Sequence, residues 1–177
     1  MSPPRWSFHQ LSYSDMSQHF SIHPVRGQED LQDTIRLFSA YVKWLDVDLT
    51  FQDFEKELQS LPGKYSQPFG EILLARDLNG SAVGCVAVRP LLETKVCEMK
   101  RLYVLPEVSG LGIGRELVKH IMNTAVKVGY NEMKLDTLSS MEKAIRLYQK
   151  MGFTSTMPYY PTPLNNTVFL AKKLPQA

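Results

Sequence analysis

The segment of this sequence best suited to bind an anion is a glycine-rich turn, Ser109-Gly110-Leu111-Gly112-Ile113-Gly114-Arg115. Glycines let the backbone approach a ligand closely, and unpaired amides at the start of a helix attract phosphate. A tight connection that needs glycine only for steric reasons is the alternative. The turn matches neither a dinucleotide fingerprint, because Arg115 and Leu117 occupy the required glycine positions, nor a P-loop, because no Gly-Lys-Ser or Gly-Lys-Thr triplet occurs.

The elements that must position this turn follow from the spacing of apolar residues. Strands are expected at 21–25, 71–76, 82–89, 96–104, 134–137 and 168–172, with a hairpin turn at Asn79-Gly80. Helices are expected at 31–45, 51–61, 113–128 and 141–151; Ser139-x-x-Glu142 predicts a capping box for the last, and Gly152 its end. This order predicts an α/β fold with a mixed sheet and helices on both of its faces.

Length and composition predict one domain, residues 20–177, preceded by an extension at 1–19 that lacks periodicity. A formal net charge of +2, with both signs interleaved, indicates neither a nucleic-acid nor a membrane partner. No signal peptide or membrane span is evident, and Cys85 and Cys97 lie in apolar runs typical of reduced core thiols, so we expect a cytoplasmic protein. The four histidines, His9, His19, His23 and His120, lack metal-ligand spacing, and no metal is expected.

Three stretches of the sequence resemble the GNAT superfamily of acetyl-CoA-dependent N-acetyltransferases. The family carries Q/R-x-x-G-x-G/A after its fourth strand, where this sequence has Ser109 to Gly114, with Ser109 in place of the usual Gln or Arg. The preceding strand, 99–107, and the segments 135–137 and 144–153 also match. The resemblance implies a mostly antiparallel, twisted sheet in which strands four and five splay apart.

The resemblance also implies acetyl-CoA as cosubstrate. The glycine turn would bind its pyrophosphate, and its pantetheine arm would pass between strands four and five, where a backbone amide of strand four would face the oxyanion. The expected cofactor-binding residues are Leu102, Tyr103, Val104, Ser109, Gly110, Leu111, Gly112, Ile113, Gly114, Arg115, Asp136, Ala144 and Lys150.

Two residues are candidates for the chemistry of acetyl transfer. An alkylammonium with a pKa near 10.4 needs about 4.6 kcal/mol to lose its proton at pH 7, so a base or a desolvating pocket must help. The resemblance implies Glu98 as this base, but it could equally be an ion-paired carboxylate, because Lys100 would share its face of the strand. Tyr148 matches the family tyrosine that donates a hydrogen bond to the coenzyme A sulfur, with a plain core aromatic as the alternative.

The acceptor side is expected to contain aromatic and basic side chains. Tyr41, Trp44, Tyr159 and Tyr160 come from regions that form the acceptor pocket in this family, although core packing would explain them as well. Arg101 or Lys100 could hold a substrate carboxylate, which would favour an amino acid. The expected activity is transfer of an acetyl group to a primary amine of a small molecule, in a ternary complex, by a monomer or homodimer. A protein or peptide acetyltransferase and a non-catalytic acyl-CoA sensor remain the alternatives.

Overall fold

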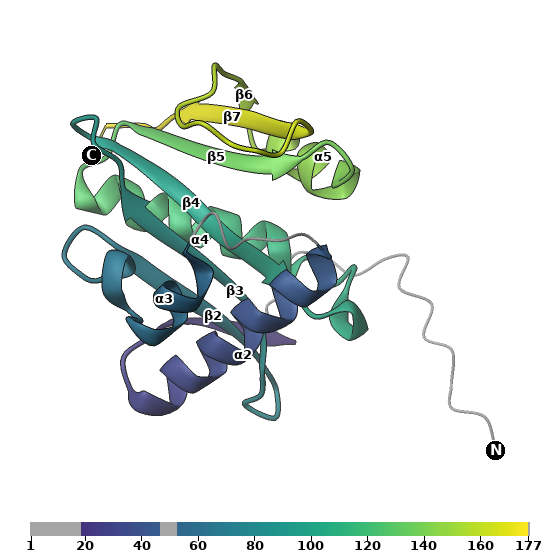
Figure 1. The fold of residues 1–177 in the computed structure, drawn as a ribbon. Coiled ribbons are helices and arrows are strands. Elements are labelled where there is room, and N and C mark those ends of the chain that lie inside the picture. Colours follow the sequence, from purple (N-terminus) through teal and green to yellow (C-terminus); the bar gives the residue numbers. More distant parts are fainter. Residues whose placement is uncertain (1–18, 47–52, 177) are drawn as a thin grey trace.

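A computed structural model of the protein describes residues 19–46 and 53–176. In these residues one open sheet has the strand order β1-β2-β3-β4-β5-β7-β6 (Figure 1). All neighbouring strands are antiparallel except β4 and β5. The strands are β1 (Phe20–Pro24), β2 (Glu71–Asp77), β3 (Ala82–Pro90), β4 (Val96–Val104), β5 (Glu132–Leu138), β6 (Thr154–Ser155) and β7 (Thr167–Lys173).

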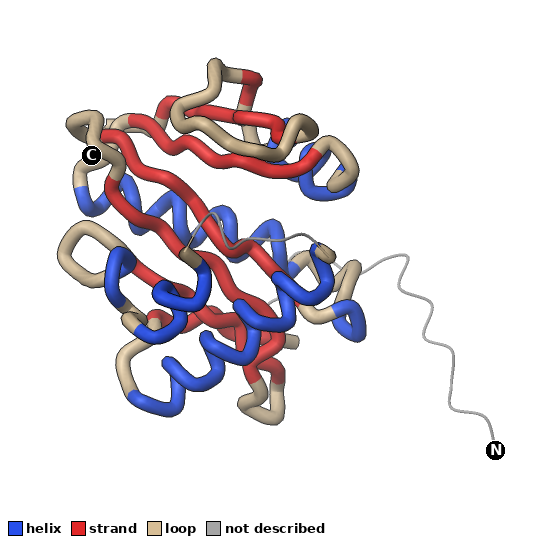
Figure 2. Tube along the Cα trace, in the orientation of Figure 1, coloured by secondary structure: helices blue, strands red, loops and turns tan. Residues whose placement is uncertain are grey.

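Helices cover both faces of the sheet (Figure 2). One face carries α2 (Gln28–Leu45) and α3 (Phe54–Gln59), followed by the 3-10 turn η2 (Gly63–Tyr65). The other face carries α4 (Ile113–Val128) and α5 (Glu142–Lys150), and a second 3-10 turn, η3 (Pro106–Val108), lies between β4 and α4. The predicted mixed α/β architecture is therefore confirmed.

The central strands are buried on both sides, which explains why they are apolar runs rather than alternating patterns. In β3, Val86 and Val88 pack toward α4, whereas Cys85 and Ala87 pack toward α2. Both cysteines are buried and free, as the sequence predicts. Each face of the sheet thus has its own apolar core.

Most element predictions are confirmed within a few residues, with two differences. The capping box at Ser139 is wrong: α5 begins at Glu142, its N-cap is Met141, and no side chain caps it. The two-residue strand β6 was not predicted, because so short a segment has no periodicity. Apart from His19, the predicted extension lies outside the described residues, as does Phe51 at the start of the predicted second helix.

Candidate active site

The sheet opens between β4 and β5. These parallel strands pair only between residues 96–98 and 132–134. The remainder of β4, to Val104, pairs with no described residue on this side. The predicted splay is therefore present (Figure 1), and it exposes main-chain groups of β4 that a sheet would otherwise pair.

A cleft occupies the gap between the two strands. Tyr41, Arg101, Leu102, Asp136 and Tyr148, all predicted as site residues, line this cleft, whereas Glu98 does not. Its full lining is Tyr41, Leu45, Met99, Lys100, Arg101, Leu102, Leu135, Asp136, Thr137, Leu138, Met141, Tyr148 and Leu164.

The glycine turn leads from the splayed end of β4 into α4. Gly110 and Gly112 have φ angles of 90° and 77°, a backbone conformation that favours glycine, and Gly112 is the N-cap of α4. Among the described residues, no amide from Gly110 to Arg115 donates to a backbone carbonyl. A Cβ added at Gly114 would lie 3.8 Å from both Val104 and Leu147, so the turn adjoins β4 and α5. Unpaired amides at the start of a helix are groups to which an anion can bind.

Tyr148 lies on the cleft side of α5. Its ring packs edge-on against Phe153, with 6.0 Å between the ring centroids. Its hydroxyl group makes no hydrogen bond to the part of the chain that the structure describes. Burial, with smaller contributions from Tyr41 and Asp136, raises the pKa of Tyr148 well above its ordinary value. The phenol is therefore protonated at neutral pH and available as a donor.

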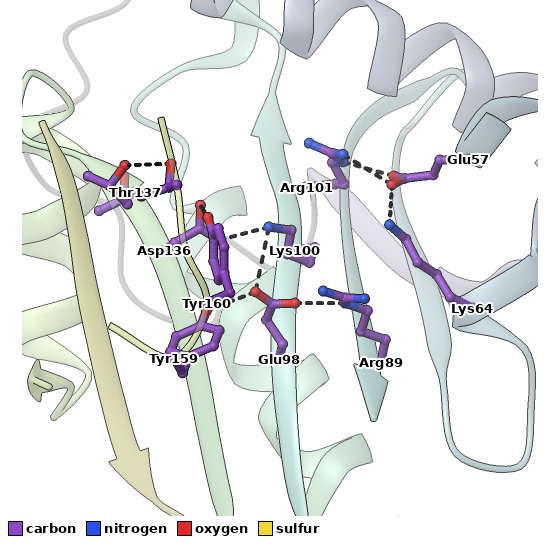
Figure 3. Close-up of polar contacts among 12 residues, drawn as sticks. Glu57, Lys64, Arg89, Glu98, Lys100, Arg101, Asp136, Thr137, Tyr159 and Tyr160 are labelled. Carbon is purple, nitrogen blue, oxygen red and sulfur yellow. Dashed lines mark hydrogen bonds and ion pairs between the residues drawn. The ribbon is translucent and has the colours of Figure 1, made fainter. Parts of the chain in front are cut away.

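A bulge in β4 places two neighbouring basic side chains on one face. Ala87 of β3 lies opposite Lys100 and Cys85 lies opposite Tyr103. Two residues of β4, Arg101 and Leu102, therefore face the single β3 residue Val86, which is a β-bulge. Arg101 has a φ angle of 60°, which is uncommon for a residue with a side chain. The bulge breaks the alternation of the strand, and Lys100 and Arg101 both reach polar groups on the α2 and α3 side (Figure 3).

The Arg101 side chain is fixed by a buried carboxylate from α3. Its Nε and Nη2 donate to the two oxygens of Glu57, at 2.9 and 3.1 Å. Glu57 also accepts a hydrogen bond from Tyr65 at 3.0 Å and pairs with Lys64 at 2.5 Å. Burial opposes the charge of Glu57, but Arg101 and Lys64 outweigh it and lower its pKa to about 2. The sequence gives no local sign of this cluster, since Glu57 and Arg101 are 44 residues apart.

Glu98 is fully buried, with 0% exposure, in a separate polar network. Arg89 Nε donates to one of its oxygens at 2.7 Å, and Tyr159 donates to the other at 2.8 Å. Lys100 Nζ lies 3.5 Å from Glu98, so the expectation that these side chains share a face is confirmed. Arg89 is not among the predicted site residues, although its register opposite Glu98 follows from the hairpin of β3 and β4.

Lys100 connects this network to β5. Its ammonium group donates to Asp136 at 2.7 Å, and the second oxygen of Asp136 accepts a hydrogen bond from Tyr160 at 3.0 Å (Figure 3). Burial opposes ionisation of Asp136, but the charge and hydrogen bond of Lys100 outweigh it and lower its pKa. The Tyr159-Tyr160 pair thus reaches the polar network through hydrogen bonds and does not line the cleft.

Other predicted site residues lie around the cleft. Trp44 is 54% exposed and packs with Tyr41 and Tyr103 in an aromatic group beside it. Ala144 is half-buried on α5, and Lys150 is exposed at the end of that helix. Leu45, Met141 and Leu164, which the sequence analysis did not single out, line the cleft; as ordinary apolar residues they carry no sequence signal.

Within the described ranges, 19–46 and 53–176, no group of three or more His, Cys, Asp or Glu side chains could hold a metal ion. Within the same ranges, no helix has the length and apolar character needed to cross a membrane.

The open parallel pair β4–β5, the glycine turn after β4 and the cleft between the two strands are the features that the resemblance to GNAT acyltransferases predicts. The family model for the acetyltransferase (GNAT) family matches residues 36–153, and the chain belongs to this family. It is 45% identical over 152 residues to an uncharacterized N-acetyltransferase of Schizosaccharomyces pombe, covering 86% of this chain and 93% of the relative.

Solved structures share the fold. An acetyltransferase of the GNAT family from Staphylococcus aureus superposes with a TM-score of 0.74 at 18% identity, covering 88% of this chain and 99% of the other. A GNAT superfamily phosphinothricin acetyltransferase from Sinorhizobium meliloti, solved in complex with acetyl-CoA, gives a TM-score of 0.65 at 14% identity, covering 88% of each chain. The chain is thus a member of a family of N-acetyltransferases, and it shares the fold of these solved structures.

Proposed function

We propose that this protein transfers the acetyl group of acetyl-CoA to a primary amine of a small molecule, by direct attack in a ternary complex. The observation that carries the proposal is the cleft itself. It joins the unpaired edge of β4, the free amides of the glycine turn beyond it and an unpartnered phenol, Tyr148, on its wall. These are the groups that an extended acyl thioester and its leaving thiolate require.

The residues of the glycine turn and of the open edge of β4 fit the successive parts of acetyl-CoA, from its pyrophosphate to its pantetheine arm. The amides of Gly110 to Arg115 would bind the pyrophosphate, with the start of α4 adding its dipole. The edge of β4 from Leu102 to Val104 would pair with the amides of the pantetheine arm. Ala144, Lys150 and Asp136 complete the proposed cofactor-binding set, from α5 and β5. When bound, acetyl-CoA supplies the activated acetyl group.

We propose that Tyr148 donates a hydrogen bond to the sulfur of coenzyme A as it leaves. A phenol is a weaker acid than a thiol, and burial raises the pKa of Tyr148 further, so full proton transfer from Tyr148 is unfavourable. A hydrogen bond from its free hydroxyl group would instead stabilise the thiolate as it forms. Tyr148 is therefore proposed as a donor rather than as a general acid.

Glu98 has two proposed roles, a general base or an ion-paired carboxylate. Its contacts favour the second, because it is fully buried, does not line the cleft and already pairs with Arg89 and Tyr159. In that role it would position Lys100, which does line the cleft. If Glu98 were the base, Glu98→Gln would shift the pH profile of kcat, whereas a positioning role would lower kcat at every pH alike.

The test is thiol release from acetyl-CoA across amino acids, polyamines, aryl amines and lysine peptides, followed by Tyr148→Phe with the best substrate. We expect kcat to fall roughly 100-fold while the Kd for acetyl-CoA changes less than about twofold. Tyr130→Phe is the matched control, because its hydroxyl group binds Phe69 O away from the cleft.

An unchanged kcat in Tyr148→Phe would remove this residue from the mechanism. Turnover of peptides alone would redirect the proposal to protein substrates. Calorimetric binding of acetyl-CoA without thiol release from any amine would favour a sensor.

A further inference from the structure

Arg101 is a cationic residue of the cleft that keeps one terminal nitrogen without a partner among the described residues. Its side chain is only 3% exposed, yet the residue lines the cleft. Glu57 engages Nε and Nη2, while Nη1 donates to no group among the residues described. In Figure 3 the end of the guanidinium group away from Glu57 points toward the side where Lys100 and Asp136 lie. Among the described residues, no buried side-chain nitrogen or oxygen lacks a hydrogen-bond partner, so Nη1, which has none, is open to solvent and can donate to a ligand in the cleft.

The surrounding ion pairs leave a net positive charge. Glu57 divides its negative charge between Arg101 and Lys64. In the neighbouring network, Arg89 and Lys100 balance Glu98 and Asp136. Together these groups comprise four cations, Lys64, Arg89, Lys100 and Arg101, against three carboxylates, so the excess is +1. An anion is the ligand that this excess favours.

The backbone conformation of Arg101 directs its side chain toward Glu57 and the cleft. Its left-handed φ of 60° belongs to the β4 bulge, and a strained residue of this kind persists only when its surroundings hold it. The two hydrogen bonds to Glu57 supply that restraint and leave one edge of the guanidinium plane free. Burial opposes its charge, but Glu57 outweighs it and raises the pKa of Arg101, so the group is a permanent cation.

The same cleft offers a place for the rest of an acceptor. Tyr41 and Leu45 of α2 contribute an apolar wall, and Tyr148 of α5 lies in the same lining. An amine with a carboxylate at one end and an apolar body would satisfy both the charge and the wall.

We propose that Nη1 of Arg101 binds the carboxylate of the acceptor, and that the acceptor is therefore an amino acid rather than a polyamine or simple amine. This inference rests on the proposed acetyl transfer to small-molecule amines. It makes Arg101 a substrate-binding residue that Glu57 positions.

The first test compares each amino acid with its own carboxamide in the thiol-release assay. The pair has the same side chain, but the amide lowers the pKa of the amino group, so the two are compared at a pH above both amine pKa values. A charge-assisted contact should then raise kcat/KM of the acid roughly 10- to 100-fold over the amide. A ratio within about twofold for every pair that turns over would overturn the assignment of Arg101. This comparison uses the unaltered protein and does not depend on any variant folding.

The second test is Arg101→Lys, which keeps the charge but cannot serve Glu57 and a carboxylate with one planar fork. We expect the acid-to-amide ratio to fall to near one. A merely structural role would lower both rates equally and keep the ratio, which would contradict the proposal. Lys64→Met is the matched control: it removes the other cationic partner of Glu57, and the ratio should persist because Nη1 is unchanged.

The two levels of the proposal fail differently. If no amine, acid or amide releases thiol, the proposed function itself is wrong. If simple amines and carboxamides turn over as well as amino acids, only the role of Arg101 is wrong.

Discussion

The two proposed binding regions are built from different parts of the polypeptide. The proposed cofactor end consists of main-chain groups, namely the amides from Gly110 to Arg115 and the open edge of β4. The proposed acceptor end consists of charged side chains from β4, β5 and α3, held by ion pairs and tyrosine hydroxyl groups. One end thus depends on backbone conformation, and the other on the identity of several side chains.

This difference has a consequence for specificity. Backbone amides at a helix start suit any phosphate ester, so the cofactor end should tolerate side-chain replacement as long as its glycines remain. The acceptor end places charges in a buried network, where removing one partner leaves another uncompensated. Differences in acceptor choice between relatives should therefore lie in these side chains.

The largest effect is expected for a substitution in the glycine turn, where main-chain groups would bind acetyl-CoA. Gly112→Pro should abolish acetyl-CoA binding, with a Kd increased more than about 100-fold, because proline cannot adopt a φ angle of 77° and has no amide to donate. Calorimetric titration with acetyl-CoA measures this. Gly80→Pro is the control: its φ angle is 82°, its amide also donates a hydrogen bond, and it lies in the hairpin away from the cleft. Binding by Gly112→Pro within tenfold of the unaltered protein would show that the pyrophosphate binds elsewhere.

The next largest effect is expected for a substitution of Glu57, which would lower the free energy of unfolding. The pKa of Glu57 is about 2 in the folded protein, against 4.5 ordinarily, so its stabilising contribution is present above about pH 5 and is lost as the pH falls toward 2. This difference corresponds to about 3 kcal/mol. Glu57→Gln should lower the free energy of unfolding by about that amount at pH 7, and the deficit should shrink between pH 4.5 and 2. Urea unfolding across this pH range measures it.

The control for this prediction is Glu142→Gln. Glu142 also has an arginine partner, Arg146, but its side chain is 71% exposed, so the change should cost less than about 0.5 kcal/mol. A deficit for Glu57→Gln that stays constant from pH 7 to 2 would mean that the charge of Glu57 contributes nothing, and the acceptor end would then resemble ordinary packing.

The smallest effect is expected for substitutions of Ser109, which test whether a side chain contributes to acetyl-CoA binding. If the backbone provides the cofactor end, Ser109→Ala should change the Kd for acetyl-CoA less than about threefold. Ser109→Arg, which restores a residue usual in the family, should tighten binding a few-fold through one added charge-assisted contact. A large loss of affinity in Ser109→Ala would instead assign the binding to that side chain.

Features that depend on local sequence could be predicted, whereas side-chain contacts between distant segments could not. The glycine turn, α4 and the β2–β3 hairpin depend on local spacing, and all three are confirmed. The bulge at Arg101 and its pairing with Glu57 depend on contacts between distant segments, and no local pattern encodes them. At Ser139 a local signal exists, but the structure does not use it, because Met141 N donates to Leu138 O and the helix starts later. The catalytic and binding roles of the candidate residues stay predictions.

The short seam between β4 and β5 also bears on the dynamics of the whole molecule. Among the described residues, the ladder from the N-terminal strands to β5, β7 and β6 consists of residues 96–98 and 132–134, with one further bond from Asn131 N to Lys95 O. Sheets resist amide hydrogen exchange as cooperative units, so the two portions should exchange as separate units on either side of this seam. A thioester lying along the open edge would replace missing rungs of the ladder, and saturating acetyl-CoA should therefore slow exchange in β5 as well as raise the melting temperature. In this sense the cosubstrate would serve as a removable strand of the sheet.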